Sequence, residues 1–156
     1  MAFDTPSLKG RALRLLSGRE HSRAELERKL QRFEEEPGTL ARALDELQAK
    51  GFISEQRVVE SVVNRRSAKL GTQRIRQELQ AKGLDPNLVS EAVETLRSTE
   101  LARAQAVWMK KFGSPAADAP EAARQMRFLA ARGFGGDTIR RVVKGGADDA
   151  PFENED

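Results

Sequence analysis

The sequence predicts an all-α protein of three tandem three-helix repeats, each similar to a winged-helix or helix-turn-helix unit, in an elongated and curved arrangement. Apolar residues recur at helical spacings of three and four along most of the chain. Strand signals are nearly missing, because Tyr is absent and no stretch alternates apolar and polar residues for long. In addition, three sets of apolar residues recur in step, which indicates an internal repeat.

The first repeat is predicted over residues 1–53. Its first helix is expected from Ser7 to Leu16, before a Ser-Gly pair. Ser22 and Glu25 are three residues apart and form a capping box that starts the second helix. The third helix is expected to end at Gly51, which precedes two apolar residues as a glycine C-cap does.

The second repeat is predicted over residues 54–97. Ser54 is the expected cap of its first helix, and Gly71 separates that helix from the next. Gly83 ends the second helix. Asp85-Pro86 then starts the third, because Pro is favoured at the first helical position.

The third repeat is predicted over residues 98–145. A loop rich in Ala and Pro is expected over 113–120, and the helix that follows should end at Gly133. Asp137 is the expected cap of the last helix. Residues 146–156 are predicted to be a disordered acidic tail, since they lack apolar periodicity and are rich in carboxylates.

The internal repeat is defined by apolar positions that stay in step. A competing interval of 32 residues, between the Gln-Ala-Lys-Gly segments at 48–51 and 80–83, fails because the next similar segment lies 50 residues further on. The register with intervals of 49 and 50 residues pairs Leu30, Leu79 and Leu129; Leu40, Val89 and Ile139; and Leu44, Val93 and Val143. A unit of about fifty residues buries little surface alone, which favours packing between neighbouring repeats.

Composition argues against most enzyme classes. The 156 residues include one His and no Cys or Tyr, and the chain has no Gly-rich phosphate-binding motif. We therefore expect a non-enzymatic protein without cofactor or metal. His21 has no evident partner for metal binding. The absence of a long apolar run predicts that the protein does not cross a membrane.

Charge is unevenly distributed along the chain. The net charge is +3, but the last nine residues carry five acids and no base, so the remainder carries +8. A basic body favours a polyanionic partner, such as nucleic acid or a nucleoprotein.

The most basic segment is residues 65–83, with six bases against one acid, Glu78. Arg74 is expected on the face opposite Ile75 and Leu79, so that a basic face lies outward. The alternative interpretation is an ordinary solvated helix surface. Charge and helix phase predict partner-binding residues at Arg28, Lys29, Arg65, Arg66, Lys69, Arg74, Arg76, Lys82, Arg127, Arg132, Arg140 and Arg141.

Five sequence blocks resemble the RecX family of regulatory proteins. They are Ala-Leu-Arg-Leu-Leu-Ser at 12–17, the segment 19–30, Gly-Phe-Ile-Ser-Glu at 51–55, the segment 69–83, and Phe-Leu-Ala-Ala-Arg-Gly-Phe at 128–134. The resemblance extends over residues 8–144 and is specific because the blocks occur together and in order.

This resemblance implies a bacterial cytoplasmic modulator of the RecA recombinase, acting in DNA repair, homologous recombination and the SOS response. It implies binding to RecA and to the RecA–single-stranded DNA filament along the helical groove, with inhibition of recombinase, ATPase and co-protease activities. It also implies a monomer with weak direct DNA binding. The fold that it implies, three tandem three-helix repeats, agrees with the internal register.

Two other functions remain open from the sequence. The second and third helices of each repeat outline a helix-turn-helix, so a transcription regulator that reads duplex DNA is the main alternative. A helical adaptor without an anionic partner is a weaker one.

Overall fold

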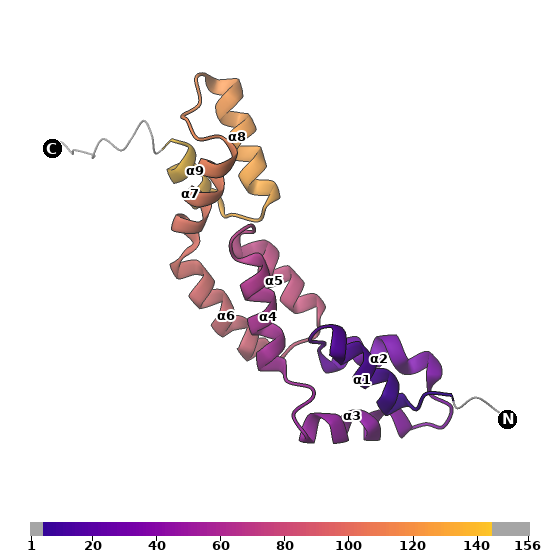
Figure 1. The fold of residues 1–156 in the computed structure, drawn as a ribbon. Coiled ribbons are helices and arrows are strands. Elements are labelled where there is room, and N and C mark those ends of the chain that lie inside the picture. The colour runs from indigo at the N-terminus through magenta and orange to yellow at the C-terminus, as the bar shows by residue number, and fades with distance from the viewer. Residues whose placement is uncertain (1–4, 145–156) are drawn as a thin grey trace. The chain divides into compact units, whose positions relative to one another are not determined.

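The computed structural model describes residues 5–144, which form nine α-helices and one short 3₁₀ helix (Figure 1). No strand occurs in this range, so the all-α prediction is confirmed, and no β-wing accompanies the three-helix units there. The predicted acidic tail, 146–156, lies outside the described residues.

The first three helices are α1 (Leu8–Gly18), α2 (Arg23–Leu30) and α3 (Thr39–Ala49), with the 3₁₀ helix η1 (Gln31–Phe33) after α2. The expected capping box is present: Ser22 Oγ accepts a hydrogen bond from Glu25 N, and Ser22 N donates to Glu25 Oε1. Gly51 has a φ of 84°, and the following N–H donates to Leu47 O, as predicted for the C-cap of α3. These helices bury Ala12, Leu26, Leu30, Leu40, Leu44, Leu47 and Ile53 in one core.

The middle helices are α4 (Glu55–Arg66), α5 (Thr72–Ala81) and α6 (Pro86–Ser98). The described residues divide into two compact units, one of residues 5–61 with 79–89 and the other of residues 62–78 with 90–144. Each of the three middle helices therefore contributes residues to both units.

The last three helices are α7 (Glu100–Lys111), α8 (Ala119–Ala131) and α9 (Gly136–Val143), which belong to the second unit (Figure 1). Asp118, in the predicted loop, caps α8 by accepting from Glu121 N. The predicted cap of α9 is wrong, because Asp137 lies inside that helix and Gly135 is its N-cap. The core contains Ala104, Val107, Leu129, Phe134, Ile139, Val142 and Val143.

The internal register is confirmed by burial. Leu30, Leu79 and Leu129 lie on α2, α5 and α8 and are at most 2% exposed. The other six paired positions lie on α3, α6 and α9, and none is more than 6% exposed. Equivalent residues of the three repeats thus have the same role in apolar packing.

No helix within residues 5–144 combines the length and the apolar character that a membrane span requires.

Candidate functional site

In the second unit, the start of α5 contacts the end of α8. Gly71 N donates to Arg132 O at 2.7 Å, and Gln73 N donates to Gly133 O at 3.2 Å. The first N–H groups of a helix and its last C=O groups have no hydrogen-bond partner within the helix. Here the free N–H groups at the start of α5 bond to the free C=O groups at the end of α8. The opposite partial charges of the two helix ends also attract.

This contact requires glycine on both sides. A Cβ added at Gly71 would lie 2.4 Å from the backbone of Gly133, closer than real Cβ contacts allow. Gly133 has a φ of 94°, and a Cβ there would lie 2.3 Å from Arg74 Cγ. The two glycines therefore let the helix ends approach closely.

The turn before α5 is held from α7 by Glu100 and Arg103, which the sequence analysis did not single out. Glu100 accepts from Thr72 N at 3.0 Å and from Gly135 N at 2.8 Å. Burial acts to raise the pKa of Glu100, but hydrogen bonds from Thr72 and Gly135 outweigh it and lower the pKa. Arg103 donates to Leu70 O at 2.6 Å and to Thr72 Oγ1 at 3.1 Å.

These contacts shape a groove of about 530 Å³, which we name the α4–α5 groove. It is lined by Arg66, Lys69, Leu70, Arg74, Gln77, Glu78, Ala131 and Arg132. Four of these residues are bases that the sequence analysis proposed for partner binding, and only Glu78 is acidic. The fold thus brings bases from the middle and last repeats to one concave surface.

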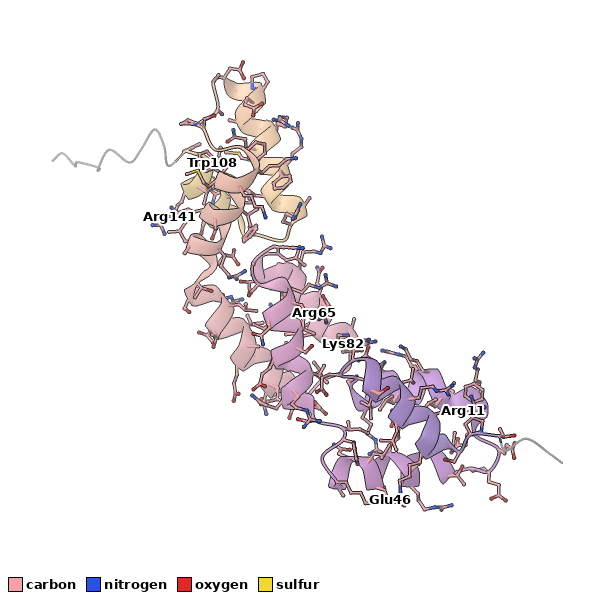
Figure 2. All side chains as sticks on the ribbon, in the orientation of Figure 1. Arg11, Glu46, Arg65, Lys82, Trp108 and Arg141 are labelled. Carbon is pink, nitrogen blue, oxygen red and sulfur yellow. The ribbon has the colours of Figure 1, made fainter. Side chains whose placement is uncertain are left out.

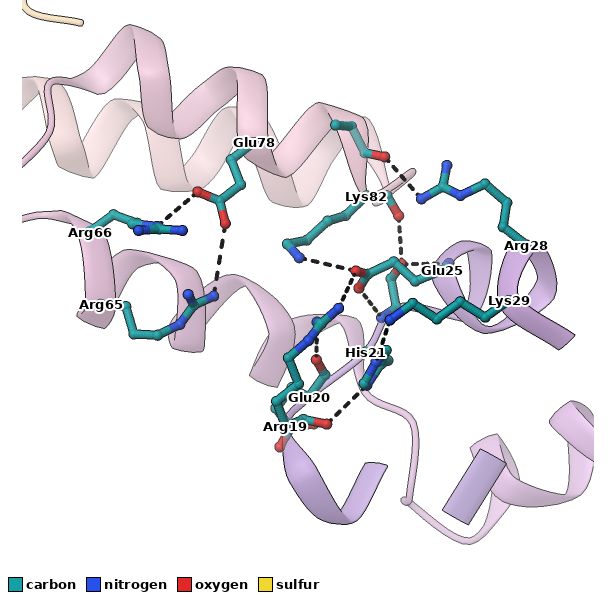
Figure 3. A network of polar contacts seen from close by, with 12 residues as sticks. Arg19, Glu20, His21, Glu25, Arg28, Lys29, Arg65, Arg66, Glu78 and Lys82 are labelled. Carbon is teal, nitrogen blue, oxygen red and sulfur yellow. Dashed lines mark hydrogen bonds and ion pairs between the residues drawn. The ribbon is translucent and has the colours of Figure 1, made fainter. Parts of the chain in front are cut away.

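Glu78 neutralises part of this surface. Arg66 Nε donates to Glu78 Oε1 at 3.0 Å, and Arg65 lies at 3.8 Å from Glu78 Oε2 (Figure 3). All three side chains are exposed by a quarter or more, so these pairs contribute little to stability. The remaining positive charge of the groove comes from Lys69, Arg74 and Arg132.

Arg74 and Arg132 also have structural contacts within the second unit. Arg74 donates to Ala131 O at 2.7 Å, at the end of α8. Arg132 lies over the Phe128 ring at 4.7 Å from its centroid. Lys69 is exposed in the turn between α4 and α5, so its ammonium group is open to an anionic partner.

Three other predicted residues lie in the first unit, where each has an intramolecular contact (Figure 3). Lys82 lies 3.2 Å from Glu25 Oε2, with its side chain 12% exposed. Arg28 donates to Ala81 O at 3.3 Å. Lys29 Nζ lies 3.3 Å from His21 Nε2, and burial lowers the pKa of that imidazole, so the ring can accept from Lys29.

The last four predicted residues lie in the second unit. Arg76 is half-buried on α5, whereas Arg127 is exposed on α8. Arg140 pairs with Asp137 one turn earlier on α9, and Arg141 projects away from the ribbon of α9 (Figure 2). None of these four lines the α4–α5 groove.

No group of three or more His, Asp or Glu side chains is placed to hold a metal ion within 5–144. Trp108, on α7, donates from Nε1 to Gln125 Oε1 at 2.8 Å and packs against the core of the last repeat. Trp108 is therefore a packing residue of this repeat.

The fold and the groove define a class of protein: a tandem helical repeat that offers a basic surface. The sequence matches the first, second and third three-helix domains of RecX over residues 9–47, 54–93 and 98–143. The chain belongs to the RecX family of regulatory proteins.

Relatives and solved structures agree with this assignment. The chain is 53% identical to the regulatory protein RecX of Leptothrix cholodnii, over 92% of this chain and 93% of that one. It is 48% identical to the regulatory protein RecX of Herminiimonas arsenicoxydans, over 96% of both chains. The crystal structure of RecX from Lactobacillus salivarius is similar in fold, with a TM-score of 0.74 and 20% identity over 88% of this chain and 93% of that one.

Proposed function

We propose that this protein binds the RecA recombinase and its filament on single-stranded DNA along the helical groove, and that it inhibits recombinase, ATPase and co-protease activities. Membership of a regulatory family supports this role. The observation that carries it is the α4–α5 groove, where bases from two repeats line one concave surface. Such a surface suits a nucleoprotein, which presents phosphates and acidic side chains together.

The contact set that we propose is the set of twelve bases, with different roles. Lys69, Arg127 and Arg141 are exposed and reach the partner directly. Lys82 and Arg28 act mainly by holding the first unit together, because they already have intramolecular partners. Exposed bases can form new ion pairs at no cost to the fold, whereas a buried pair must first be broken.

The proposed setting is the bacterial cytoplasm, where a recombinase acts on DNA, and the proposed active form is a monomer. Direct binding to DNA is expected to be weak and to decrease as salt rises. A transcription regulator would instead bind one duplex sequence much more tightly than others. A selection from random duplex DNA that yields a preferred sequence would favour that alternative.

The direct test is the DNA-dependent ATPase activity of RecA. We expect the activity to decrease as this protein is added to RecA on single-stranded DNA. An unchanged ATPase rate at a molar excess of the protein would contradict the proposed function.

A pair of double variants tests the groove. Lys69→Glu with Arg132→Glu reverses two charges inside the groove, and we expect weaker inhibition and a smaller dependence on salt. Arg97→Glu with Lys110→Glu makes the same change in net charge at exposed positions of the second unit outside it. If both double variants inhibit equally well, the groove is not the contact surface.

Reversal of two bases of α5, Arg74→Glu with Arg76→Glu, would be a less clear test of the groove. Arg74 caps the end of α8, so its reversal would disturb the contact between the helix ends as well as the surface charge.

A further inference from the structure

The second unit carries almost all of the positive charge of the described residues. Within 62–78 and 90–144 it has fifteen bases and seven acids, a net charge of +8. The first unit, within 5–61 and 79–89, has twelve bases and eleven acids, a net charge of +1. In this part of the second unit, ion pairs involve only four of the bases: Arg65, Arg66, Arg124 and Arg140. Most of the charge of the second unit is therefore not neutralised by its own acids.

Part of this charge surrounds two partly buried aromatic rings on α7 and α8. The rings of Phe112 and Phe128 pack edge to face, with their centroids 5.4 Å apart. Lys111 Nζ lies 5.3 Å from the centroid of Phe128, and Arg132 Cζ lies 4.7 Å from it. Arg124 Cζ lies 5.2 Å from the centroid of Phe112. We name these five residues the α7–α8 aromatic surface.

This surface suits a partner that is both acidic and aromatic. A cation that lies over a ring is already ordered, so less side-chain entropy is lost when it binds a carboxylate. Glu121 accepts from Arg124 Nε at 3.0 Å, on an exposed part of α8. One acid thus faces three bases, and the two rings add apolar area between them.

The C-terminal segment of the same chain has the complementary composition. Residues 145–156 follow α9 and lie outside the described residues. They contain five acids, no base and one aromatic residue, Phe152, with acids on both sides of it. The surface pairs two rings with three bases, whereas the segment pairs one ring with five acids. Charge and apolar character therefore match.

The segment is also long enough to reach the surface. α9, which precedes it, packs against both α7 and α8 (Figure 1). Twelve extended residues span at most about 40 Å, whereas a compact unit of about 70 residues is about 30 Å across. Covalent attachment through a short linker gives the segment an effective concentration of the order of mM. Even a weak contact would therefore be well populated.

We propose that residues 148–156 bind the α7–α8 aromatic surface of the same chain. Phe152 lies against the two rings, and the flanking carboxylates pair with Lys111, Arg124 and Arg132. Arg132 also lines the α4–α5 groove, so the bound segment covers one of the bases that a nucleoprotein would contact. This last consequence rests on the proposed function, whereas the binding of the segment does not.

A spin label on the segment tests the contact in the full chain. The chain has no Cys, so Asn154→Cys introduces one thiol for a nitroxide and leaves all five acids in place. In NMR spectra of the ¹⁵N-labelled protein, the nitroxide broadens the signals of nearby amides. We expect broadening to be strongest at residues 111–112 and 124–132. It should disappear in about 1 M salt, where the Debye length is about 3 Å.

A pair of double variants tests the surface. Lys111→Glu with Arg124→Glu reverses two of its charges and should abolish the broadening. Arg97→Glu with Lys110→Glu makes the same change in net charge at exposed positions of the second unit, over neither ring, and should retain it. The dispersion of the amide signals shows whether each variant is folded. If the first variant is not, Lys111→Gln replaces it and should reduce the broadening.

Two results would overturn the binding of the segment to its own chain. One is equal broadening in the surface and control variants. The other is broadening of the same amides when spin-labelled chains without ¹⁵N are mixed with ¹⁵N chains that have no label, because the segment would then bind a second copy.

The consequence for the groove has a separate test. Replacing the five acids by amides removes the charge of the segment, with the changes Asp148→Asn, Asp149→Asn, Glu153→Gln, Glu155→Gln and Asp156→Asn. This variant should inhibit the ATPase activity of RecA at a lower concentration than wild type. An unchanged concentration would overturn the consequence for the groove. A wild-type chain without any inhibition would overturn the proposed function, and the broadening would still decide whether the segment binds.

Discussion

Lys82 Nζ lies 3.2 Å from Glu25 Oε2, and both side chains are largely buried where the end of α5 meets the start of α2. Ser22 Oγ donates to Lys82 O at 2.6 Å in the same place. In the repeat register, Ser22 corresponds to Gly71 and Lys82 to Arg132, which are joined by their own hydrogen bond in the second unit. Equivalent helix ends are therefore in contact in both units. The donor is the hydroxyl of Ser22 in the first unit and the backbone N–H of Gly71 in the second.

Glu25 makes the first of these contacts sensitive to acid. Burial acts to raise the pKa of Glu25, but hydrogen bonds from Arg19, from Ser22 N–H and from Lys82 outweigh it and lower the pKa to about 2 from 4.5. A carboxyl with a depressed folded-state pKa stabilises the protein above its unfolded pKa, and this contribution is lost as the pH falls toward the folded value. We expect the stability of wild type to fall between about pH 4.5 and about pH 2.

The variant Glu25→Gln should show a smaller fall over this range, because its side chain does not titrate. Urea unfolding at several pH values measures the difference. Parallel stability curves for wild type and Glu25→Gln would show that Glu25 does not carry this acid sensitivity.

Replacing Glu100 removes a buried acceptor. Glu100 is only 8% exposed, and its carboxylate accepts hydrogen bonds from the N–H groups of Thr72 and Gly135. Glu100→Ala leaves both donors without this partner, so we expect a loss of about 2–4 kcal/mol in the free energy of unfolding. Trp108, the one Trp of the chain, reports unfolding by fluorescence. Glu94→Ala, at an exposed position of α6, should change stability by about 0.5 kcal/mol or less; a similar effect of both variants would contradict the role of Glu100.

Gly133 should not tolerate a side chain. Gly133→Ala places a Cβ in a left-handed backbone conformation and against Arg74, so we expect a loss of at least about 1–2 kcal/mol. Gly18→Ala is the control, because no heavy atom lies within 4 Å of its added Cβ, and stability should stay unchanged or rise by up to about 1 kcal/mol. Thermal unfolding of the two variants distinguishes them. Equal melting temperatures would show that α8 and α5 do not need to approach this closely.

The repeat register predicts equal sensitivity at three leucines. Leu79→Ala should cost about 2–5 kcal/mol, and Leu30→Ala and Leu129→Ala should fall in the same range, because all three are buried to 2% exposure or less. Gln80→Ala, at an exposed position next to Leu79, should have little effect. Urea unfolding measures each change. A neutral effect at one leucine alone would show that its repeat packs differently.

Much of the fold was predictable because the relevant signals are local. The capping box of Ser22 and Glu25 and the glycine cap at Gly51 involve residues a few positions apart, and both are confirmed. Asp137 was assigned wrongly because an acid near a helix start can be either the cap or a first-turn residue, and both positions favour negative charge.

The candidate site was predictable only in part. Charge identified Arg66, Lys69, Arg74 and Arg132, but their meeting in one groove depends on contacts between residues far apart in sequence. Glu100 and Arg103 were missed because single charges on a mainly apolar helix carry no sequence signal for the turn that they hold.

The amino-acid sequence alone determined the helical class, the three repeats, the core positions and the family, because helix caps and apolar periodicity act over a few residues and recur along the chain. The tertiary structure decided which bases remain exposed and which hold helix ends in place. Arg74 and Ala131 are 57 positions apart, as are Lys82 and Glu25, and such pairs form only when neighbouring repeats pack. Charge is a property of each residue, whereas its availability to a partner depends on what the folded chain places beside it.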